Sequence, residues 1–343
     1  MTTDLQEHDE ASIAAQRECE TPFATPSDAE QEIAPPAPGH AGIGVVYGLL
    51  AYGTWGTVVP LYFRAVRDVS PLELVAHRVL WGLPTIALML TLWRRWSDYV
   101  AIVTNPRALA VLAVTTVLIA INWLGFVYAV ANDRLIEVSL GYYINPLVSI
   151  GLGMIFLGER LRRAQWVSVA IAATGVSYLA LQEGVPELAL IVAFSFGFYG
   201  LLRKRAHADA LVGLSVEMTL LFPLVLVYMS FLFATGTAGF LGPESETPPV
   251  PRGVRDLLIP LAGLVTIGPL LWFALAARRL KLATIGFLQY IAPTGQLLLA
   301  IVVGEQFDRT QVVVFVLIWA ALILYSVDSA RAHRASRRPD TGE

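Results

Sequence analysis

Three ionisable residues lie in an otherwise apolar stretch, PLELVAHRVLWGLPTIALML, which covers residues 71–90. In a helix, Glu73 and His77 are four positions apart and share a face, whereas Arg78 lies about 140° from Glu73 around the axis. Histidine changes its protonation between pH 5 and 8, so a pair with Glu73 could bind a proton. Arginine stays charged and binds carboxylates through its planar fork. The stretch therefore predicts a proton-binding pair and, on another face, a group that receives an anionic substrate or an acid from another helix.

The same residues also have a structural interpretation. Glu73 lies near the start of the stretch and could sit at a membrane surface. The long stem of Arg78 could carry its charge outward to water. The sequence leaves both interpretations open.

Two prolines mark a second group of candidate residues. Pro146 and Pro293 lie about halfway along two apolar segments, and each would free the carbonyl four residues back, those of Tyr142 and Gln289. Paired helix breaks of this kind point to a binding site in membrane transporters. The alternative is a pair of tolerated kinks whose polar side chains bond to neighbouring helices. The polar candidates around the breaks and in a further apolar segment are Tyr142, Tyr143, Asn145, Gln289, Tyr290 and Asn122.

The elements that must position these residues are membrane helices. Of the 343 residues, 56% are hydrophobic and 15% are charged, against about 25% charged in soluble domains. This composition indicates a polytopic membrane protein, in which each span needs roughly 20 mostly apolar residues. Ten segments meet or nearly meet that length: 42–64, 72–93, 108–130, 135–157, 165–182, 187–202, 211–233, 256–277, 283–304 and 311–328.

The segments outside these spans differ in composition. Residues 1–40 contain nine acidic residues and one basic residue, which predicts a disordered acidic tail. The end of the chain, 329–343, is expected to be a basic tail. Residues 94–107 are expected to lie at the membrane interface, and residues 234–255, rich in Gly and Pro, are expected to form a flexible loop.

The distribution of Lys and Arg predicts the orientation, because cytoplasmic loops carry an excess of these residues. One set of connections and the C-terminal tail together hold 16 of them, and the opposite set holds six. The larger set consists of Arg94, Arg95, Arg107, Arg160, Arg162, Arg163, Arg203, Lys204, Arg205, Arg278, Arg279, Lys281, Arg331, Arg334, Arg337 and Arg338. The prediction is a multi-pass protein of the plasma (inner) membrane with both termini in the cytoplasm.

The chain also contains an internal repeat. AYGTWG at 51–56 matches SFGFYG at 195–200, YINP at 143–146 matches YIAP at 290–293, and GERLRRAQ at 158–165 matches GEQFDRTQ at 304–311. The offset of the first match also brings Glu73 onto Glu217, which makes Glu217 a candidate site residue. Each half holds five predicted spans, so the second half enters the membrane from the opposite side. This inverted arrangement is typical of secondary transporters.

The same motifs carry a family resemblance over residues 42–328. YGTWG, PLELVAHRVLWG, NWLGFVYAVAN, SLGYYINPL, FLGERL, SFGFYGLLRK, LQYIAPTGQLLL and GEQF resemble the drug/metabolite transporter superfamily, with two EamA-type repeats of the RarD (chloramphenicol-sensitivity) branch. The resemblance implies ten helices, cytoplasmic termini and transport of small organic solutes.

Several classes of activity find no support in the sequence. There is no phosphate-binding loop, HExxH motif or Cys/His ligand cluster, and the chain has one cysteine, Cys19. No metal or cofactor is expected, and neither is a nucleic-acid partner. A membrane-embedded, lipid-modifying enzyme that uses Glu73 and His77 is the alternative to a transporter, although the inverted repeat argues against it.

The sequence thus predicts an all-α membrane protein of ten transmembrane helices arranged as two inverted five-helix repeats, 41–182 and 183–328. The predicted function is that of a permease rather than an enzyme. It would export small organic solutes, such as amino-acid-like metabolites or drugs, by alternating access, with protons as a candidate coupling ion.

Overall fold

The computed structural model describes residues 38–131, 135–183, 187–206, 208–242, 249–303 and 309–335. The chain divides into two units, Met1–Gly39 and His40–Glu343, and the second contains the packed helices. The predicted acidic tail lies outside the described residues except for its last three positions, which belong to the first helix.

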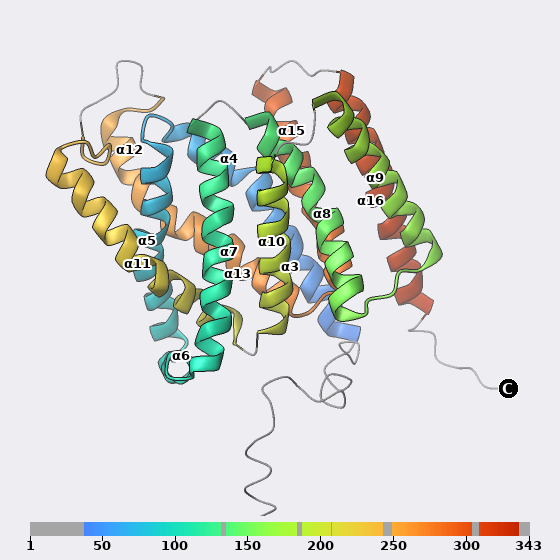
Figure 1. The fold of residues 1–343 in the computed structure, drawn as a ribbon, viewed down its shortest axis with the longest axis horizontal. Helices are drawn as coiled ribbons and strands as arrows, with labels where there is room; N and C mark the ends of the chain where they lie inside the picture. The colour runs from blue at the N-terminus through green and yellow to red at the C-terminus, as the bar shows by residue number, and fades with distance from the viewer. Residues whose placement is uncertain are drawn as a thin grey trace, which may run out of the picture. The chain divides into compact units, whose positions relative to one another are not determined.

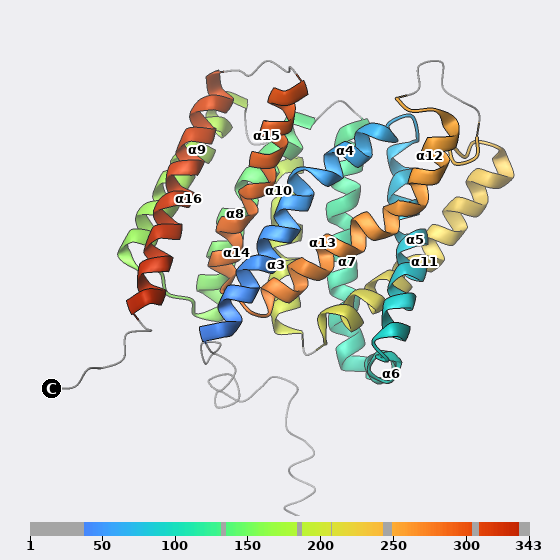
Figure 2. The same ribbon diagram turned by 180° about the vertical axis from the view of Figure 1, so that it is seen from behind.

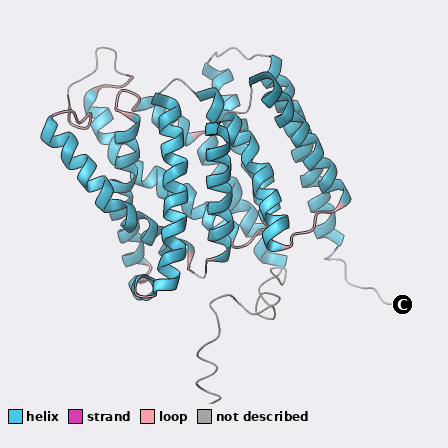
Figure 3. Cartoon of the chain, viewed as in Figure 1, coloured by secondary structure: helices cyan, strands magenta, loops and turns pink. Residues whose placement is uncertain are grey.

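All the regular elements of the described residues are helices (Figure 1, Figure 3). They are α3 (Pro38–Gly56), α4 (Val58–Ala65), α5 (Pro71–Leu92), α6 (Trp96–Val103), α7 (Pro106–Ala131), α8 (Leu135–Leu157), α9 (Arg163–Glu183), α10 (Glu187–Arg205), α11 (Ala210–Thr235), α12 (Arg252–Leu258), the 3-10 turn η1 (Ile259–Leu261), α13 (Ala262–Ala277), α14 (Leu282–Gln289), α15 (Ile291–Val303) and α16 (Arg309–Ala335).

Within the described ranges, seven helical stretches are long and apolar enough to cross a membrane. They are Gly42–Ala65, Pro71–Leu92, Pro106–Phe126, Arg163–Gln182, Ala210–Thr235, Arg252–Ala277 and Val312–Ala332. Large apolar side chains on these and neighbouring helices are exposed, among them Leu181 at 83% and Ile155 at 76%, as expected for surfaces that face lipid. The protein is therefore an all-helical, multi-pass membrane protein. The remaining predicted spans fall on α8, α10 and α14–α15, and the count of ten stays a prediction.

Consecutive long helices run in opposite directions, as Figures 1 and 2 show. Their connections therefore lie in two groups, which we call the α6 side and the α12 side after the short helix found at each. α5 packs against α11 and α13, α8 packs against α10 and α14, and α9 packs against α16. These contacts form the frame that holds the candidate residues.

Some of the helices approach each other very closely. A Cβ added at Gly286 in α14 would lie 2.7 Å from the carbonyl oxygen of Pro146 in α8, and one added at Gly263 in α13 would collide with the backbone of Trp81 in α5. Only glycine allows backbones to pack at such distances. These two contacts bring α14 onto α8 and α13 onto α5, next to the candidate residues of those helices.

The structure corrects three predicted boundaries. α10 continues to Arg205 instead of ending at 202, because the side chain of Arg203 is buried in the helix packing. The predicted basic tail begins as helix, since α16 continues to Ala335. The predicted loop 234–255 is partly helical, because α12 begins at Arg252. An ion pair of 3.1 Å between Arg255 and Asp68 fixes α12.

Candidate functional site

Helix α5 presents its three ionisable residues to different neighbours. It begins at Pro71, where proline at the first helical position is well tolerated. Glu73 and His77 are fully buried, with exposures of 1% and 0%, whereas Arg78 is partly buried on another face of the helix. The separation of Arg78 from Glu73 follows from their five-residue spacing.

Glu73 holds the segment that follows α11. Its two carboxylate oxygens accept hydrogen bonds from the backbone N–H groups of Gly239 at 2.8 Å and Phe240 at 2.9 Å. Nε2 of His77 lies 3.5 Å from Oε1 of Glu73, and the imidazole packs edge-on against the ring of Phe240, with 5.1 Å between ring centres. Glu73 and His77 are thus brought together as predicted, and together they form a contact between α5 and residues 239–240.

Arg78 lies where several helices meet. Its Nε donates a hydrogen bond of 2.9 Å to Oγ1 of Thr266 in α13. Its guanidinium carbon lies 4.2 Å from the ring centre of Trp123 in α7 and 5.9 Å from that of Phe63 in α4. Cations are attracted to the faces of aromatic rings at such distances. The guanidinium is therefore held by aromatic faces and one hydroxyl.

Two tyrosines complete the surroundings of Arg78. Tyr62 of α4 and Tyr142 of α8 lie near the guanidinium. Among the residues that the structure describes, no carboxylate forms an ion pair with Arg78. We call Arg78, Thr266, Trp123, Phe63, Tyr62 and Tyr142 the Arg78 site. A buried or half-buried guanidinium with free N–H groups can bind a carboxylate or phosphate through two parallel hydrogen bonds.

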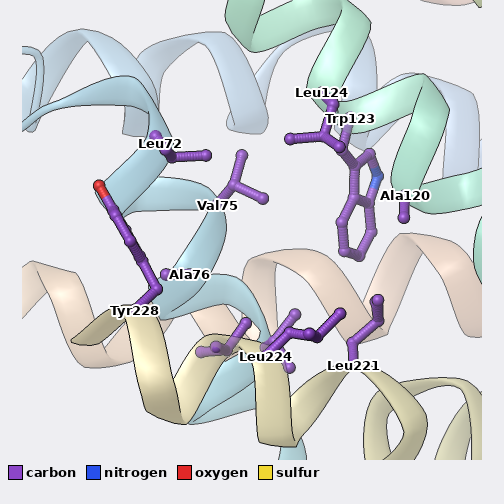
Figure 4. Close-up of a pocket in the computed structure, with 11 residues that line it drawn as sticks. Leu72, Val75, Ala76, Ala120, Trp123, Leu124, Leu221, Leu224 and Tyr228 are labelled. Atoms are coloured by element: carbon purple, nitrogen blue, oxygen red, sulfur yellow. The ribbon is translucent and has the colours of Figure 1, made fainter. Parts of the chain in front are cut away.

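An apolar groove lies beside this site, on the surface between α5, α7 and α11 (Figure 4). Trp123 forms part of its wall, and Leu224 and Leu221 of α11 face Val75 and Ala76 of α5 across it. Its lining is almost entirely apolar, with the hydroxyl of Tyr228 as an exception. The groove alone has few polar groups that could bind a polar solute. The Arg78 site, by contrast, has a charged group that could bind one specifically.

The candidates around the two prolines do not all lie together. Asn122 faces α10, because its Nδ2 donates to the carbonyl of Val192 at 3.0 Å and to Oγ of Ser195 at 3.3 Å. This bonding accounts for its burial as a helix–helix contact. Asn145 is 5% exposed and its Oδ1 has no hydrogen-bond partner, so it is a polar group available inside α8.

Gln289, Tyr290 and Tyr143 lie at the contact between α8 and α14. The hydroxyl of Tyr290 donates to the carbonyl of Tyr143 at 3.3 Å, and Oγ of Ser149 donates to Oε1 of Gln289 at 3.5 Å. Tyr290 is fully buried. These bonds connect the two segments that the repeat pairs with each other.

The helix breaks differ from those expected at Pro146 and Pro293. α8 is uninterrupted through Pro146, because proline removes only one backbone donor and the close packing of α14 supports the helix there. The second interruption falls at Tyr290, between α14 and α15, three residues before Pro293. Pro293 instead lies in the first turn of α15, where the absence of an N–H costs little.

Glu217 lies in a second buried cluster, in the part of α11 nearer the α6 side. Its Oε1 accepts a hydrogen bond of 2.7 Å from Thr115 of α7, and its Oε2 accepts one of 3.2 Å from the hydroxyl of Tyr199 of α10. Nε of Arg203 is 3.8 Å from Oε1. We call Glu217, Thr115, Tyr199 and Arg203 the Glu217 site; it is separate from the Arg78 site.

A third carboxylate caps a helix. Glu159, which follows α8, accepts hydrogen bonds from the backbone N–H groups of Leu282 at 2.6 Å and Ala283 at 2.9 Å. These are the first residues of α14, where a negative charge complements the free N–H groups and the helix dipole. Lys204 lies 3.5 Å from the same carboxylate. Glu159 is therefore a structural link between α8 and α14.

Sequence reasoning missed the neighbours that define both sites. Thr266, Thr115 and Tyr62 carry no sequence signal beyond being polar in apolar segments. The sequence analysis used Arg203 only as one of the positive charges of a cytoplasmic connection. Arg203 and Glu217 lie on two helices that one short connection joins, and this closeness in sequence could have indicated an ion pair. In the described part of the chain, no group of three His, Cys, Asp or Glu residues is placed to hold a metal ion.

Comparisons with known proteins agree with this picture. A profile of the EamA-like transporter family matches residues 42–181. An uncharacterized transporter of Vibrio cholerae is 43% identical over 86% of this chain and 95% of its own length. Protein RarD of Escherichia coli is 41% identical over 86% of this chain and 97% of its own. The chloramphenicol-sensitive protein RarD of Pseudomonas aeruginosa is 31% identical over 87% and 98%.

A solved crystal structure has a similar fold, with a TM-score of 0.59 over 83% of this chain and 97% of the other, at 19% identity. At that identity the likeness concerns the fold alone. The relatives, by contrast, are similar along nearly their whole length. The chain therefore belongs to the EamA-like transporter family, in which it groups with the RarD proteins.

Proposed function

We propose that the protein is a secondary transporter that exports small organic solutes with an anionic group across the inner (plasma) membrane. The observation that carries this proposal is the position of Arg78. Its guanidinium lies among α4, α5, α7, α8 and α13, bonded to Thr266 and stacked on Trp123, without a carboxylate partner in the described residues. A charge held in a membrane protein without a counter-ion is a functional candidate, and an anionic solute would supply the missing charge.

The helix contacts support an inverted repeat of 41–182 and 183–328. If the repeat holds, α5 corresponds to α11, α8 to α14–α15 and α9 to α16, and each of these helices packs against its own counterpart. Contacts between non-equivalent helices also occur in pairs: α5 with α13 matches α11 with α7. A two-fold axis in the membrane plane would produce this pattern.

Glycine contacts follow the same pattern. Gly141 of α8 packs on the backbone of Ala189 in α10, and Gly48 of α3 packs on Leu288 of α14. Under the repeat these are nearly equivalent pairs. Two similar halves that meet along such an axis can rock against each other and open a central site to either side in turn. The Arg78 site lies between residues of both halves, as such a mechanism requires.

The orientation follows from the charges. The larger set of Lys and Arg falls on connections of the α6 side, so we propose that this side faces the cytoplasm, together with both termini. Protons are the coupling ion that we propose, because a gradient of protons is available at this membrane and the apolar helices α5 and α11 each hold a buried carboxyl group, Glu73 and Glu217. The name of the Pseudomonas relative associates that protein with chloramphenicol, and we propose drugs, together with amino-acid-like metabolites, as the solute classes in which the anionic solute is to be sought.

The experiment is an untargeted comparison of solutes inside and outside cells that lack the protein, express it, or express Arg78→Ala. We expect at least one anionic solute to be retained without the protein and released with wild type, but not with Arg78→Ala at equal membrane abundance. Chemical alteration of a solute without its movement would instead support the membrane-embedded enzyme. Movement that does not depend on Arg78 would contradict the assignment of the anion site.

A further inference from the structure

The second buried carboxylate, Glu217, has surroundings that the Arg78 site does not explain. We propose that Glu217 is a reversible proton-binding site, built so that both its charged and its neutral form are hydrogen-bonded. Its use in coupling rests on the transport function proposed above, whereas the binding of the proton does not.

Burial makes Glu217 an unusual place for a charge. Its side chain is 1% exposed, and it lies between α7, α10 and α11. A carboxylate in such a position is tolerated only when it is paired and hydrogen-bonded. A carboxyl group that is to gain and lose a proton there needs partners that suit both forms.

Thr115 is a partner of that kind. Its Oγ1 lies 2.7 Å from Oε1 of Glu217 and 2.9 Å from the carbonyl oxygen of Leu112. A hydroxyl has one hydrogen, so it cannot donate to both acceptors at once. When Glu217 is charged, Thr115 donates to Oε1. When Oε1 carries a proton, the carboxyl O–H donates to Thr115, and the threonine hydrogen turns to the carbonyl of Leu112.

The other oxygen of Glu217 keeps its partner in both forms. Tyr199 donates to Oε2 at 3.2 Å, and Oε2 accepts this bond whether Oε1 is ionised or protonated. The change of state therefore moves one proton onto Oε1 and rotates one hydroxyl. No other covalent bond is formed or broken.

Glu73 provides a contrast at the equivalent position of the repeat. Its hydrogen-bond partners are the backbone N–H groups of Gly239 and Phe240, which can donate but cannot accept, and Nε2 of His77 lies 3.5 Å from Oε1. The two N–H groups favour the carboxylate form, and a proton on either oxygen would weaken one of the two bonds. Glu73 is therefore suited to a fixed contact and Glu217 to a change of state.

Arg203 links the protonation state of Glu217 to the packing of the helices around it. Its side chain is 3% exposed, its Nε and one terminal nitrogen lack hydrogen-bond partners, and Nε remains 3.8 Å from Oε1. A Cβ at position 213 would collide with this guanidinium, so Gly213 makes the space for it. A charged Glu217 balances the buried arginine, and a neutral Glu217 leaves it unbalanced, which favours hydration and opening near the α6 side.

The other polar and charged side chains near this region contact one another. Tyr99 of α6 donates to Thr219, one half-turn beyond Glu217 on α11. Asp209, which precedes α11, lies 3.7 Å from Arg95 and 3.6 Å from Arg278. Within the described residues, Tyr199 and Arg203 are the titratable or charged side chains that contact Glu217 itself.

Infrared difference spectroscopy of the full-length protein in lipid vesicles tests the proposal without any solute, so its result is independent of the transport proposal. The probe is the proton itself. A change of pH from 8 to 5 should produce the carbonyl-stretch band of a protonated carboxyl group. Other carboxyl groups of the chain also contribute near pH 5, so we expect Glu217→Gln to lose one component of this band that Glu73→Gln, the matched control, retains.

A second variant keeps the test decisive if Glu217→Gln folds poorly. Thr115→Val preserves the shape of the side chain and removes the acceptor of the carboxyl O–H, so the band should move to higher wavenumber. A difference spectrum that Glu217→Gln leaves unchanged, or a Glu217 component that Thr115→Val leaves at the same wavenumber, would each overturn the proposal.

Discussion

The guanidinium carbon of Arg78 lies 4.2 Å from the ring centre of Trp123, so a cation of α5 is stacked on an aromatic side chain of α7. The same indole forms part of the wall of the apolar groove. Trp123 thus separates a hydrocarbon surface from a fixed positive charge. An amphipathic anion could use both, with its charged end on Arg78 and its apolar part along the aromatic rings.

Substitution of Arg78 should reveal whether the charge or its shape matters. Arg78→Ala removes at least one charge-assisted hydrogen bond, worth about 1.5–3 kcal/mol, which corresponds to a roughly 10- to 150-fold loss of apparent affinity for an anionic solute. Arg78→Lys keeps the charge but loses the planar fork, so we expect partial activity. The measurement is concentration-dependent transport in vesicles at matched protein abundance.

Trp123→Leu is the companion variant for this prediction. It retains an apolar side chain but removes the aromatic face, which contributes about 0.5–2 kcal/mol to holding a cation. We expect a smaller loss of affinity than for Arg78→Ala. Normal transport by Arg78→Ala would mean that the arginine serves only the packing of α5 against α13.

Much of the fold could be predicted from the sequence, because membrane helices are recognisable from the length and apolar composition of their segments. The predicted segment 72–93 and the helix α5 differ by one residue at each end. The face of Arg78 was also predictable, since a five-residue spacing separates it from Glu73 by helix geometry alone.

The partners of these residues could not be predicted, because they come from elsewhere in the chain. Glu73 is 166 residues from Gly239 in sequence, and Arg78 is 188 from Thr266. Segment 234–255 has the composition of a loop, yet Gly239 and Phe240 are fixed by a buried carboxylate. Glycine and proline indicate how a backbone can turn but not what it binds.

The contact between Glu73 and residues 239–240 should contribute to stability. Glu73→Ala leaves two partly buried backbone N–H groups without acceptors, and the cost of about 1–3 kcal/mol for a fully buried unpaired group is an upper limit for each. Glu73→Gln retains one acceptor oxygen and should cost less. Thermal unfolding of the purified protein in detergent would rank the three proteins, with wild type highest and Glu73→Ala lowest. Equal melting temperatures would mean that water replaces the carboxylate at these N–H groups.

Labelling of cysteines tests the orientation. Cys19 is the one native cysteine, and in intact cells it should resist a maleimide that cannot cross the membrane. In a Cys19→Ser background, Thr237→Cys on the α12 side should be labelled from outside, and Thr104→Cys on the α6 side only after the cells are opened. Both threonines are exposed, so poor reaction cannot be attributed to burial. Labelling in the reverse order would invalidate the proposed topology.

A pH gradient across the membrane distinguishes the two positions at which a proton could bind. The sequence prediction places coupling at His77, and the structure places that imidazole in a fixed contact with Glu73 and Phe240. Glu217, by contrast, has a hydroxyl partner that can reverse its bond. We therefore expect Glu217→Gln to lose transport driven by the gradient and to retain solute exchange at equal pH, because glutamine mimics the neutral carboxyl group without releasing a proton. His77→Gln should keep its response to the gradient.

The measurement is flux of the solute identified in the cell comparison, into vesicles with and without an imposed gradient. Loss of the response in His77→Gln together with its survival in Glu217→Gln would assign coupling to the histidine, because only the group that carries the proton can connect the gradient to the cavity state.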